Sequence, residues 1–146
     1  MRLAFGADPN AIELKDHLLA TAKSLGHECE DYGRDDPVYA NVAIDVATAV
    51  ASGKFDRGVL VCGTGIGVAI AANKVPGAYA ANIHDVYQAE RAQLSNNANI
   101  VTFGAQVIGP VLAARLLEAY LAVSYDPNSR SAPKVGRICD YEANGQ

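Results

Sequence analysis

The sequence predicts an α/β domain in which helices cover both faces of a five-stranded parallel sheet, giving a three-layer α/β/α sandwich. Two observations predict it. Short apolar or β-branched runs alternate with longer segments of helical period almost to the end of the chain. The run GVLVC, residues 58–62, is apolar along its length rather than alternating, which is typical of a strand buried on both faces of a parallel sheet.

The first half of the chain predicts two strand-and-helix pairs. Residues 2–5 suit the first strand, and apolar positions within residues 11–25 recur at helical spacing before Gly26 ends the helix. Residues 27–31 suit a second strand. A polar loop follows, and apolar positions within residues 39–50 then lie on one face of a second helix.

The second half continues the alternation after a Gly-rich turn. Asp85 with Gln88 three residues later resembles a capping pair at the start of a helix. The expected elements are strands at residues 58–62, 78–83 and 99–103 and helices at residues 68–74, 85–94 and 111–121.

Length, composition and charge limit the possible functions. The chain has 146 residues, 50% hydrophobic and 19% charged, which fits one domain over residues 1–146. A formal net charge of -4 provides no basic surface for nucleic acid. No segment resembles a signal peptide or reaches the ~20 apolar residues of a membrane span, so we expect a cytoplasmic protein. Three cysteines without a CxxC spacing predict neither a disulfide framework nor a zinc site.

Residues 126–146 are expected to form a distinct C-terminal segment. It begins with the turn-rich run DPNSRSAP. The segment is either a helix that packs on a neighbouring subunit or a loosely held tail.

The candidate site lies where the first and third strands end. With a flavodoxin-like strand order of 2-1-3-4-5, the order reverses between these two strands. Open parallel sheets bind ligands beyond the carboxyl ends of the strands at such a point. The segments there are GADPN, residues 6–10, and CGTGIG, residues 62–67.

The segment from Cys62 to Gly67 has the composition of an anion-binding turn. Three glycines in five positions let the backbone turn tightly with its N–H groups directed at one spot. A dinucleotide fingerprint and a Walker loop do not match it. A nest of N–H donors beside a thiol and a hydroxyl suits stabilising an enolate oxygen while Cys62 moves a proton. The plainer alternative is a buried structural thiol at the end of an apolar strand.

Four further residues are candidates because of their positions. Asp8 follows the first strand and either accepts a substrate hydroxyl or caps the next helix. Arg130 and Lys134, four residues apart, either grip a phosphate from one helical turn or lie on the solvated surface. His84, at the end of the fourth strand, is a second-rank candidate for proton transfer.

Three blocks of the sequence resemble one enzyme family: GADPNAIELK, CGTGIGVAIAANKVPGAYAA and NNANIVTFGAQVIG. They are similar to type B ribose-5-phosphate isomerases and galactose-6-phosphate isomerase subunits, and the resemblance runs from the first strand to Arg130. It implies a Rossmann-like sheet and catalysis on a sugar phosphate without metal or cofactor. It also implies a homodimer or homotetramer whose active sites are shared between two chains.

The resemblance implies roles for residues at matching positions. Cys62 is the base that moves a proton between C1 and C2, and Thr64 is the acid that helps to move the hydroxyl proton. Arg130 and Lys134 hold the phosphate. The substrate-binding residues are Gly63, Gly65, Ile66 and Gly67 of the turn, which bind the enediolate oxygen, and Asp8, Tyr39 and Asn96, which contact the sugar.

The chain departs from the family pattern where ring-opening histidines are expected. Pro9 follows the first-strand Asp, and Ser95, itself a possible site residue, precedes Asn96. Gln106 and Lys134 stand where the family has arginines, so fewer bidentate hydrogen bonds to the phosphate are expected. A tetrose 4-phosphate has its O4 esterified and needs no ring opening, and the SNNAN and RSA segments resemble tetrulose-phosphate isomerases. We therefore expect interconversion of D-erythrulose 4-phosphate and D-erythrose 4-phosphate through a cis-enediolate.

Three alternatives remain open at this point. Ribose 5-phosphate is the runner-up substrate. The chain can also be one subunit of a two-chain galactose-6-phosphate-type isomerase, although the presence of Cys62 and Thr64 argues against a noncatalytic subunit. A flavodoxin-like binding domain would need the sheet but no thiol at the glycine turn.

Overall fold

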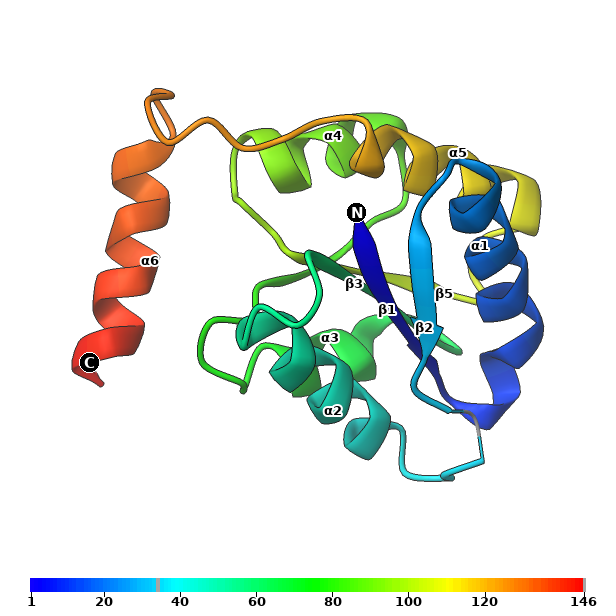
Figure 1. The fold of residues 1–146 in the computed structure, drawn as a ribbon. Helices are drawn as coiled ribbons and strands as arrows, with labels where there is room; N and C mark the ends of the chain where they lie inside the picture. The colour runs from blue at the N-terminus through cyan, green and yellow to red at the C-terminus, as the bar shows by residue number, and fades with distance from the viewer. Residues whose placement is uncertain (34, 146) are drawn as a thin grey trace.

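The computed structural model describes residues 1–33 and 35–145, so residue 146 of the predicted C-terminal segment lies outside it. Its elements, shown in Figure 1, are β1 (Arg2–Ala7), the 3-10 turn η1 (Pro9–Ala11), α1 (Ile12–Ser24), β2 (Glu28–Asp31), α2 (Tyr39–Ala51), β3 (Arg57–Cys62), α3 (Ile66–Ala72), β4 (Ala80–Asn82), α4 (Val86–Leu94), β5 (Ile100–Gly104), α5 (Pro110–Leu121) and α6 (Ala132–Asn144). The strands are parallel, with α1, α4 and α5 on one face of the sheet and α2 and α3 on the other. The predicted α/β sandwich is confirmed. None of the described helices is long and apolar enough to cross a membrane.

The predicted strand order is wrong: the sheet runs β2-β1-β3-β5-β4 instead of 2-1-3-4-5. β5, the run IVTFG, is buried at every position and pairs with β3 on one side and β4 on the other. β4 has only three residues, all half-buried, and lies at the edge. The longer apolar strand takes the inner place because it has more surface to bury there. Cys62 therefore pairs with Gly104, and Asn82 pairs with Thr102.

Alternate side chains of β3 enter two separate cores. Val59 and Val61 pack with residues of α1 and α5, whereas Leu60 and Cys62 pack with residues of α2 and α3. Gly6 in β1 allows α2 to approach, since a Cβ there would lie 2.7 Å from Cγ2 of Val42. Cys62 thus ends its strand on the face covered by α2 and α3.

The buried side chain of Arg57, at the start of β3, holds the end of α5. Its guanidinium donates to the carbonyl oxygens of Tyr120 and Val123, each at 2.6 Å, and lies 4.7 Å from the centre of the Tyr120 ring. Burial lowers the pKa of Arg57 from its ordinary value, and the two carbonyls provide hydrogen bonds that the buried cation requires. The chain therefore leaves the body of the domain at a fixed point after α5.

Helix α6 stands apart from the sheet at the end of an extended connector (Figure 1). The carboxylate of Glu142 ties it to the body, accepting hydrogen bonds from the Gly77 N–H at 3.0 Å and the Tyr79 hydroxyl at 2.9 Å. Burial raises the pKa of Tyr79, so its hydroxyl keeps the proton that it donates. Ile138 and Tyr141 of the same helix remain 49% and 57% exposed. The predicted helix is confirmed, and its packing on a neighbouring subunit stays a prediction.

Candidate active site

The carboxyl ends of β1 and β3 lie side by side. Ala7 pairs with Val61, and the Asp8 N–H donates to the Val61 carbonyl at 2.9 Å. β2 lies on the other side of β1, so the strand order reverses between β1 and β3 whatever the position of β4. Residues 6–10 and 62–67 therefore lie together at one edge of the sheet, where the sequence predicts a site.

Cys62 ends β3 with its sulfur turned towards the loop that follows. The Gly65 N–H donates to Sγ at 3.1 Å, and the residue is only 6% exposed. A hydrogen bond from an N–H group stabilises a thiolate more than a thiol. Gly65 has a φ of +79°, and a Cβ there would lie 2.6 Å from Oδ1 of Asn82. Only glycine therefore allows the turn that brings this N–H to the sulfur.

The loop also presents donors that have no partner. Among the described residues, nothing accepts a hydrogen bond from the N–H groups of Gly63, Thr64 and Gly67. The Ile66 N–H donates to the Thr64 hydroxyl oxygen at 3.2 Å, which leaves the hydroxyl proton available for donation. These groups can stabilise a negatively charged oxygen beside the thiol.

Tyr39 begins α2, and Asp8 directly follows β1 beside the end of β3. Tyr39 lies against Gly67, since a Cβ on that glycine would lie 2.6–2.7 Å from the ring and its hydroxyl. Asp8 caps η1: its Oδ1 accepts from the Asn10 N–H at 2.9 Å. Its Oδ2 makes no hydrogen bond with the described residues. The carboxylate can therefore cap the turn and accept a substrate hydroxyl at once.

The wall behind the loop comes from β4 and β5, and none of its residues is among the predicted site residues. Nδ2 of Asn82 donates to the Thr64 carbonyl at 3.3 Å, and the buried Thr102 hydroxyl donates to the Gly65 carbonyl at 2.8 Å. Gly104 allows the loop to approach, because a Cβ there would lie 2.6 Å from the Thr64 carbonyl oxygen. The only sequence signal for both side chains is a polar residue within an apolar strand.

Gln106 lies over the front of the loop. Its amide atoms are 3.4–3.6 Å from the position of a Cβ on Gly63, and its main-chain N–H donates to the Gly63 carbonyl at 2.9 Å. The family resemblance implies an arginine at this position. A neutral amide therefore borders the loop in place of a cation.

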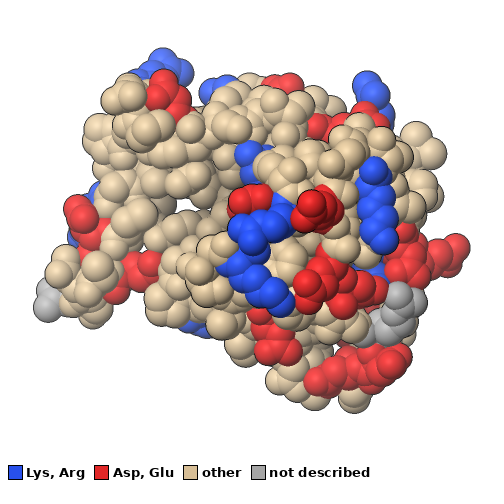
Figure 2. Space-filling model, in the orientation of Figure 1, with Lys and Arg blue, Asp and Glu red and all other residues tan. Residues whose placement is uncertain are grey.

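The predicted phosphate-binding residues gather elsewhere, between α4 and α6. A cavity of about 530 Å³ is lined by Arg130, Lys134, Ser95 and Asn96, together with Arg91, which no sequence motif marks. Nε of Arg91 is buried and has no hydrogen-bond partner among the described residues. No residue of the loop 62–67 lines this cavity. Figure 2 shows α6 set apart from the body by a hollow, and one chain does not bring these cations to the thiol.

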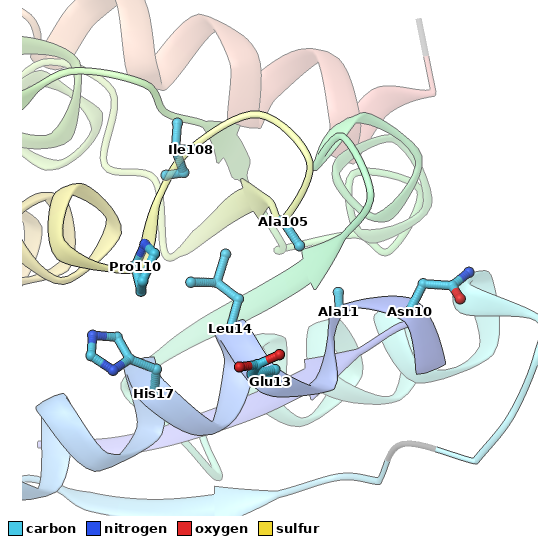
Figure 3. A pocket seen from close by; sticks show the side chains of 8 residues that line it. All are labelled: Asn10, Ala11, Glu13, Leu14, His17, Ala105, Ile108 and Pro110. Carbon is cyan, nitrogen blue, oxygen red and sulfur yellow. The ribbon is translucent and has the colours of Figure 1, made fainter.

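A further cavity, of about 420 Å³, lies between α1 and the loop that precedes α5 (Figure 3). Asn10 stands at one end of it and His17 at the other. Ala105 also lines it, and its N–H donates to the Cys62 carbonyl at 2.9 Å. The cavity therefore adjoins residues 62–67, called the thiol loop below. Among the described residues that line it, none is a lysine or arginine.

His84 follows the edge strand β4 and has an exposed side chain. Its main-chain N–H donates to Oε1 of Gln88 at 2.9 Å. Because β5 separates β4 from β3, His84 stands one strand farther from Cys62 than the predicted order places it. Within the described part of the chain, no group of three or more His, Cys, Asp or Glu is arranged to hold a metal ion.

The similarity of this chain to known proteins extends over almost its whole length. Residues 3–138 match the model of a family described as Ribose/Galactose Isomerase. The chain is 44% identical over 146 residues to the D-erythrulose-4-phosphate isomerase of Pectobacterium atrosepticum, with 97% of this chain and 95% of the relative covered. It is 46% identical over 138 residues to the ribose-5-P isomerase B of Listeria innocua, with coverage of 92% and 93%.

A solved structure agrees with the sequence comparison. The ribose-5-phosphate isomerase B of Clostridium thermocellum matches with a TM-score of 0.93 at 36% identity, covering 100% of both chains. The match includes the segment that carries α6. Sequence and fold thus agree, and the chain belongs to the ribose/galactose isomerase family.

Proposed function

We propose that this chain is an aldose–ketose isomerase that interconverts D-erythrulose 4-phosphate and D-erythrose 4-phosphate through a cis-enediolate. The observation that carries the proposal is the Cys62 thiol, which accepts from the Gly65 N–H at 3.1 Å beside the unpaired donors of the same loop. Proton transfer between two adjacent carbons needs such a base next to groups that stabilise an oxyanion. The name of the Pectobacterium relative supports this choice of sugar.

The proposed proton path uses two side chains and the loop backbone. The Cys62 thiolate takes a proton from C1 of the ketose and returns it to C2, which produces the aldose. Between these transfers the unpaired N–H groups of the loop stabilise the enediolate oxygen. The Thr64 hydroxyl passes the hydroxyl proton between O2 and O1, because its oxygen already accepts from Ile66 and its hydrogen is available.

The missing histidines support a four-carbon sugar. Pro9 and Ser95 stand where ring-opening histidines are expected, and serine is a poor proton donor near neutral pH. A tetrose 4-phosphate cannot close a furanose ring and reaches the site open or hydrated. Ribose 5-phosphate is the second candidate, because the Listeria relative at 46% identity is by name a ribose-5-P isomerase B.

A second copy of the chain supplies the phosphate-binding cations in this proposal. Arg130, Lys134 and Arg91 line one cavity with Asn96, and the loop 62–67 does not line it. A cationic cavity of this kind suits a phosphate, since paired guanidinium and ammonium groups form charge-assisted hydrogen bonds to its oxygens. In a homodimer or homotetramer, α6 of one copy then faces the thiol loop of another.

Exposed apolar side chains support this assembly. Ile66 and Ile70 of α3, at the thiol loop, are 54% and 58% exposed, and Ile138 and Tyr141 of α6 are exposed to a similar degree. Apolar surface on both segments would be removed from water if they met across an interface. The proposed contact therefore buries apolar surface while it completes the site.

Replacing Cys62 by serine should lower kcat at least about 100-fold, because general-base catalysis typically contributes that much or more and a hydroxyl is a weaker base. The exchange is nearly isosteric, so thermal stability should remain close to that of the wild type. Turnover of D-erythrulose 4-phosphate by the purified protein measures the effect. Cys29→Ser is the matched control, because that thiol lies in β2 against the His27 carbonyl, 3.7 Å away. Near-normal turnover by Cys62→Ser would contradict the assignment of Cys62 as the general base.

Truncating Arg130 or Lys134 to alanine should raise KM about 10-fold to 100-fold with a smaller change in kcat. A charge-assisted contact to the phosphate contributes roughly 1.5–3 kcal/mol, equally in ground and transition states. Arg137→Ala is the control, because this residue of α6 stacks on Tyr141 at 5.5 Å and does not line the cavity. Steady-state kinetics with D-erythrulose 4-phosphate decides the matter: wild-type kcat/KM in both variants would exclude α6 from phosphate binding.

Mixing two impaired variants should restore activity if active sites are shared, provided that turnover is measured at a substrate concentration near the wild-type KM, where both variants are nearly inactive. Cys62→Ser keeps the cations, and Arg130→Ala/Lys134→Ala keeps the thiol. After both are unfolded and refolded together in equal amounts, half of the dimers are mixed and each mixed dimer has one intact site, so activity should reach about a quarter of the wild-type value. Each variant refolded alone is the control. Mixed dimers without activity would place the complete site within one chain.

The tetrose pair should have a kcat/KM at least about 10-fold above that for ribose 5-phosphate, a barrier difference of ~1.4 kcal/mol. The reason is that only the small open-chain fraction of ribose 5-phosphate in solution can react, because the chain has no histidine at the positions where a ring-opening one is expected. The measurement compares both substrates in the wild type and in His84→Ala. Equal or better use of ribose 5-phosphate by the wild type would refute the tetrose assignment. Loss of that use in the variant would identify His84 as a substitute ring-opening acid.

A further inference from the structure

Two side chains behind the thiol loop each hold one of its peptide groups. Nδ2 of Asn82 donates to the Thr64 carbonyl at 3.3 Å. The N–H of that same peptide group belongs to Gly65 and donates to Sγ of Cys62 at 3.1 Å. A continuous path of hydrogen bonds therefore runs from the Asn82 amide through one peptide group to the sulfur.

The next peptide group is held in the same way from β5. The Thr102 hydroxyl, which is fully buried, donates to the Gly65 carbonyl at 2.8 Å. The N–H of that peptide belongs to Ile66 and donates to the Thr64 hydroxyl oxygen at 3.2 Å. Cys62 and Thr64 are the two groups with proposed roles in proton transfer. Each accepts a hydrogen bond from a main-chain N–H whose own peptide carbonyl is held by Asn82 or Thr102.

Asn82 is hard to explain as a contribution to stability. Its Oδ1 is buried and accepts no hydrogen bond from the described residues. A buried acceptor without a partner lowers the stability of the fold, and an apolar side chain of similar shape would remove that unpaired oxygen. The part of the side chain that has a partner is the donor that meets the Thr64 carbonyl.

We propose that Asn82 and Thr102 are positioning residues that orient the Thr64–Gly65 and Gly65–Ile66 peptides so that their N–H groups stabilise the Cys62 thiolate and place the Thr64 hydroxyl. This inference rests on the proposed function, in which Cys62 is the base. A donor at a carbonyl oxygen also polarises the peptide and strengthens the hydrogen bond that its N–H makes. Neither side chain touches the substrate in this arrangement.

The first test is Asn82→Leu, which keeps the size of the side chain and removes its donor. Alkylation of Cys62 by iodoacetamide at pH 7, followed by mass spectrometry of its peptide, should slow by about 3-fold to 10-fold as one supported hydrogen bond weakens. Turnover should fall through kcat with KM little changed, while the melting temperature stays the same or rises. Wild-type alkylation and kcat, or a fall in activity that only follows a loss of stability, would overturn the proposal.

The second test uses Thr102, where a conservative variant is available. Thr102→Val removes the hydroxyl without changing the shape and should lower kcat, whereas Thr102→Ser keeps the donor and should retain most of it. Thr21→Val is the matched control, because the Thr21 hydroxyl also donates to a main-chain carbonyl, that of His17 at 2.9 Å, but within α1 and not to the loop 62–67. Equal losses in Thr102→Val and Thr102→Ser would show a packing role and overturn the assignment.

The alkylation result separates this inference from the proposed function. It needs only the thiol and no substrate. If Cys62→Ser keeps its turnover, the base assignment fails, and slower alkylation in Asn82→Leu still supports the positioning of the sulfur. If Cys62→Ser is inactive and Asn82→Leu reacts and turns over as the wild type does, the positioning fails alone.

Discussion

The pairing of β3 with β5 is the contact on which the rest of the site depends. It sets Cys62 beside Gly104, where the absence of a side chain allows the following loop to fold down onto the end of β5. It also brings the Thr102 hydroxyl under that loop and, through β4, the Asn82 amide. A glycine-rich turn is flexible by composition, and these neighbours are what hold it in one conformation.

The groups needed for chemistry are divided between two regions of the chain. The thiol ends β3, and the N–H groups of Gly63, Thr64 and Gly67 lie on the segment that follows it, which is held by hydrogen bonds to Cys62 and to β4 and β5. The cations of the proposed phosphate cavity lie on α4, on the connector and on α6, a helix tied to the body by Glu142. Proton transfer requires exact geometry, whereas a phosphate tolerates variation in the position of long cationic side chains. The division matches those two requirements.

The thiol loop could be predicted from its own residues, whereas the pairing of strands distant in the sequence could not. An apolar run followed by three glycines predicts a buried strand and a tight turn, so the positions of Cys62 and its loop could be predicted from the sequence. Nothing local decides which of two short apolar strands pairs with β3, so the order of β4 and β5 was wrong. The roles of Asn82 and Thr102 follow from that order and were missed with it. The docking of α6 depends on a contact between Tyr79 and Glu142, 63 residues apart.

Gly65 and Gly104 restrict how the substrate range of this fold can evolve. A methyl group on Gly65 would meet the main chain of Phe103 at 2.9 Å, and one on Gly104 would meet the Thr64 carbonyl oxygen at 2.6 Å. Backbone cannot move aside as a flexible side chain does, so single substitutions at these two glycines cannot reshape the contact between the loop and the end of β5. Adaptation to a longer or differently charged sugar must therefore accumulate on the rim, at positions such as Gln106. Directed-evolution libraries built on this enzyme are best concentrated there.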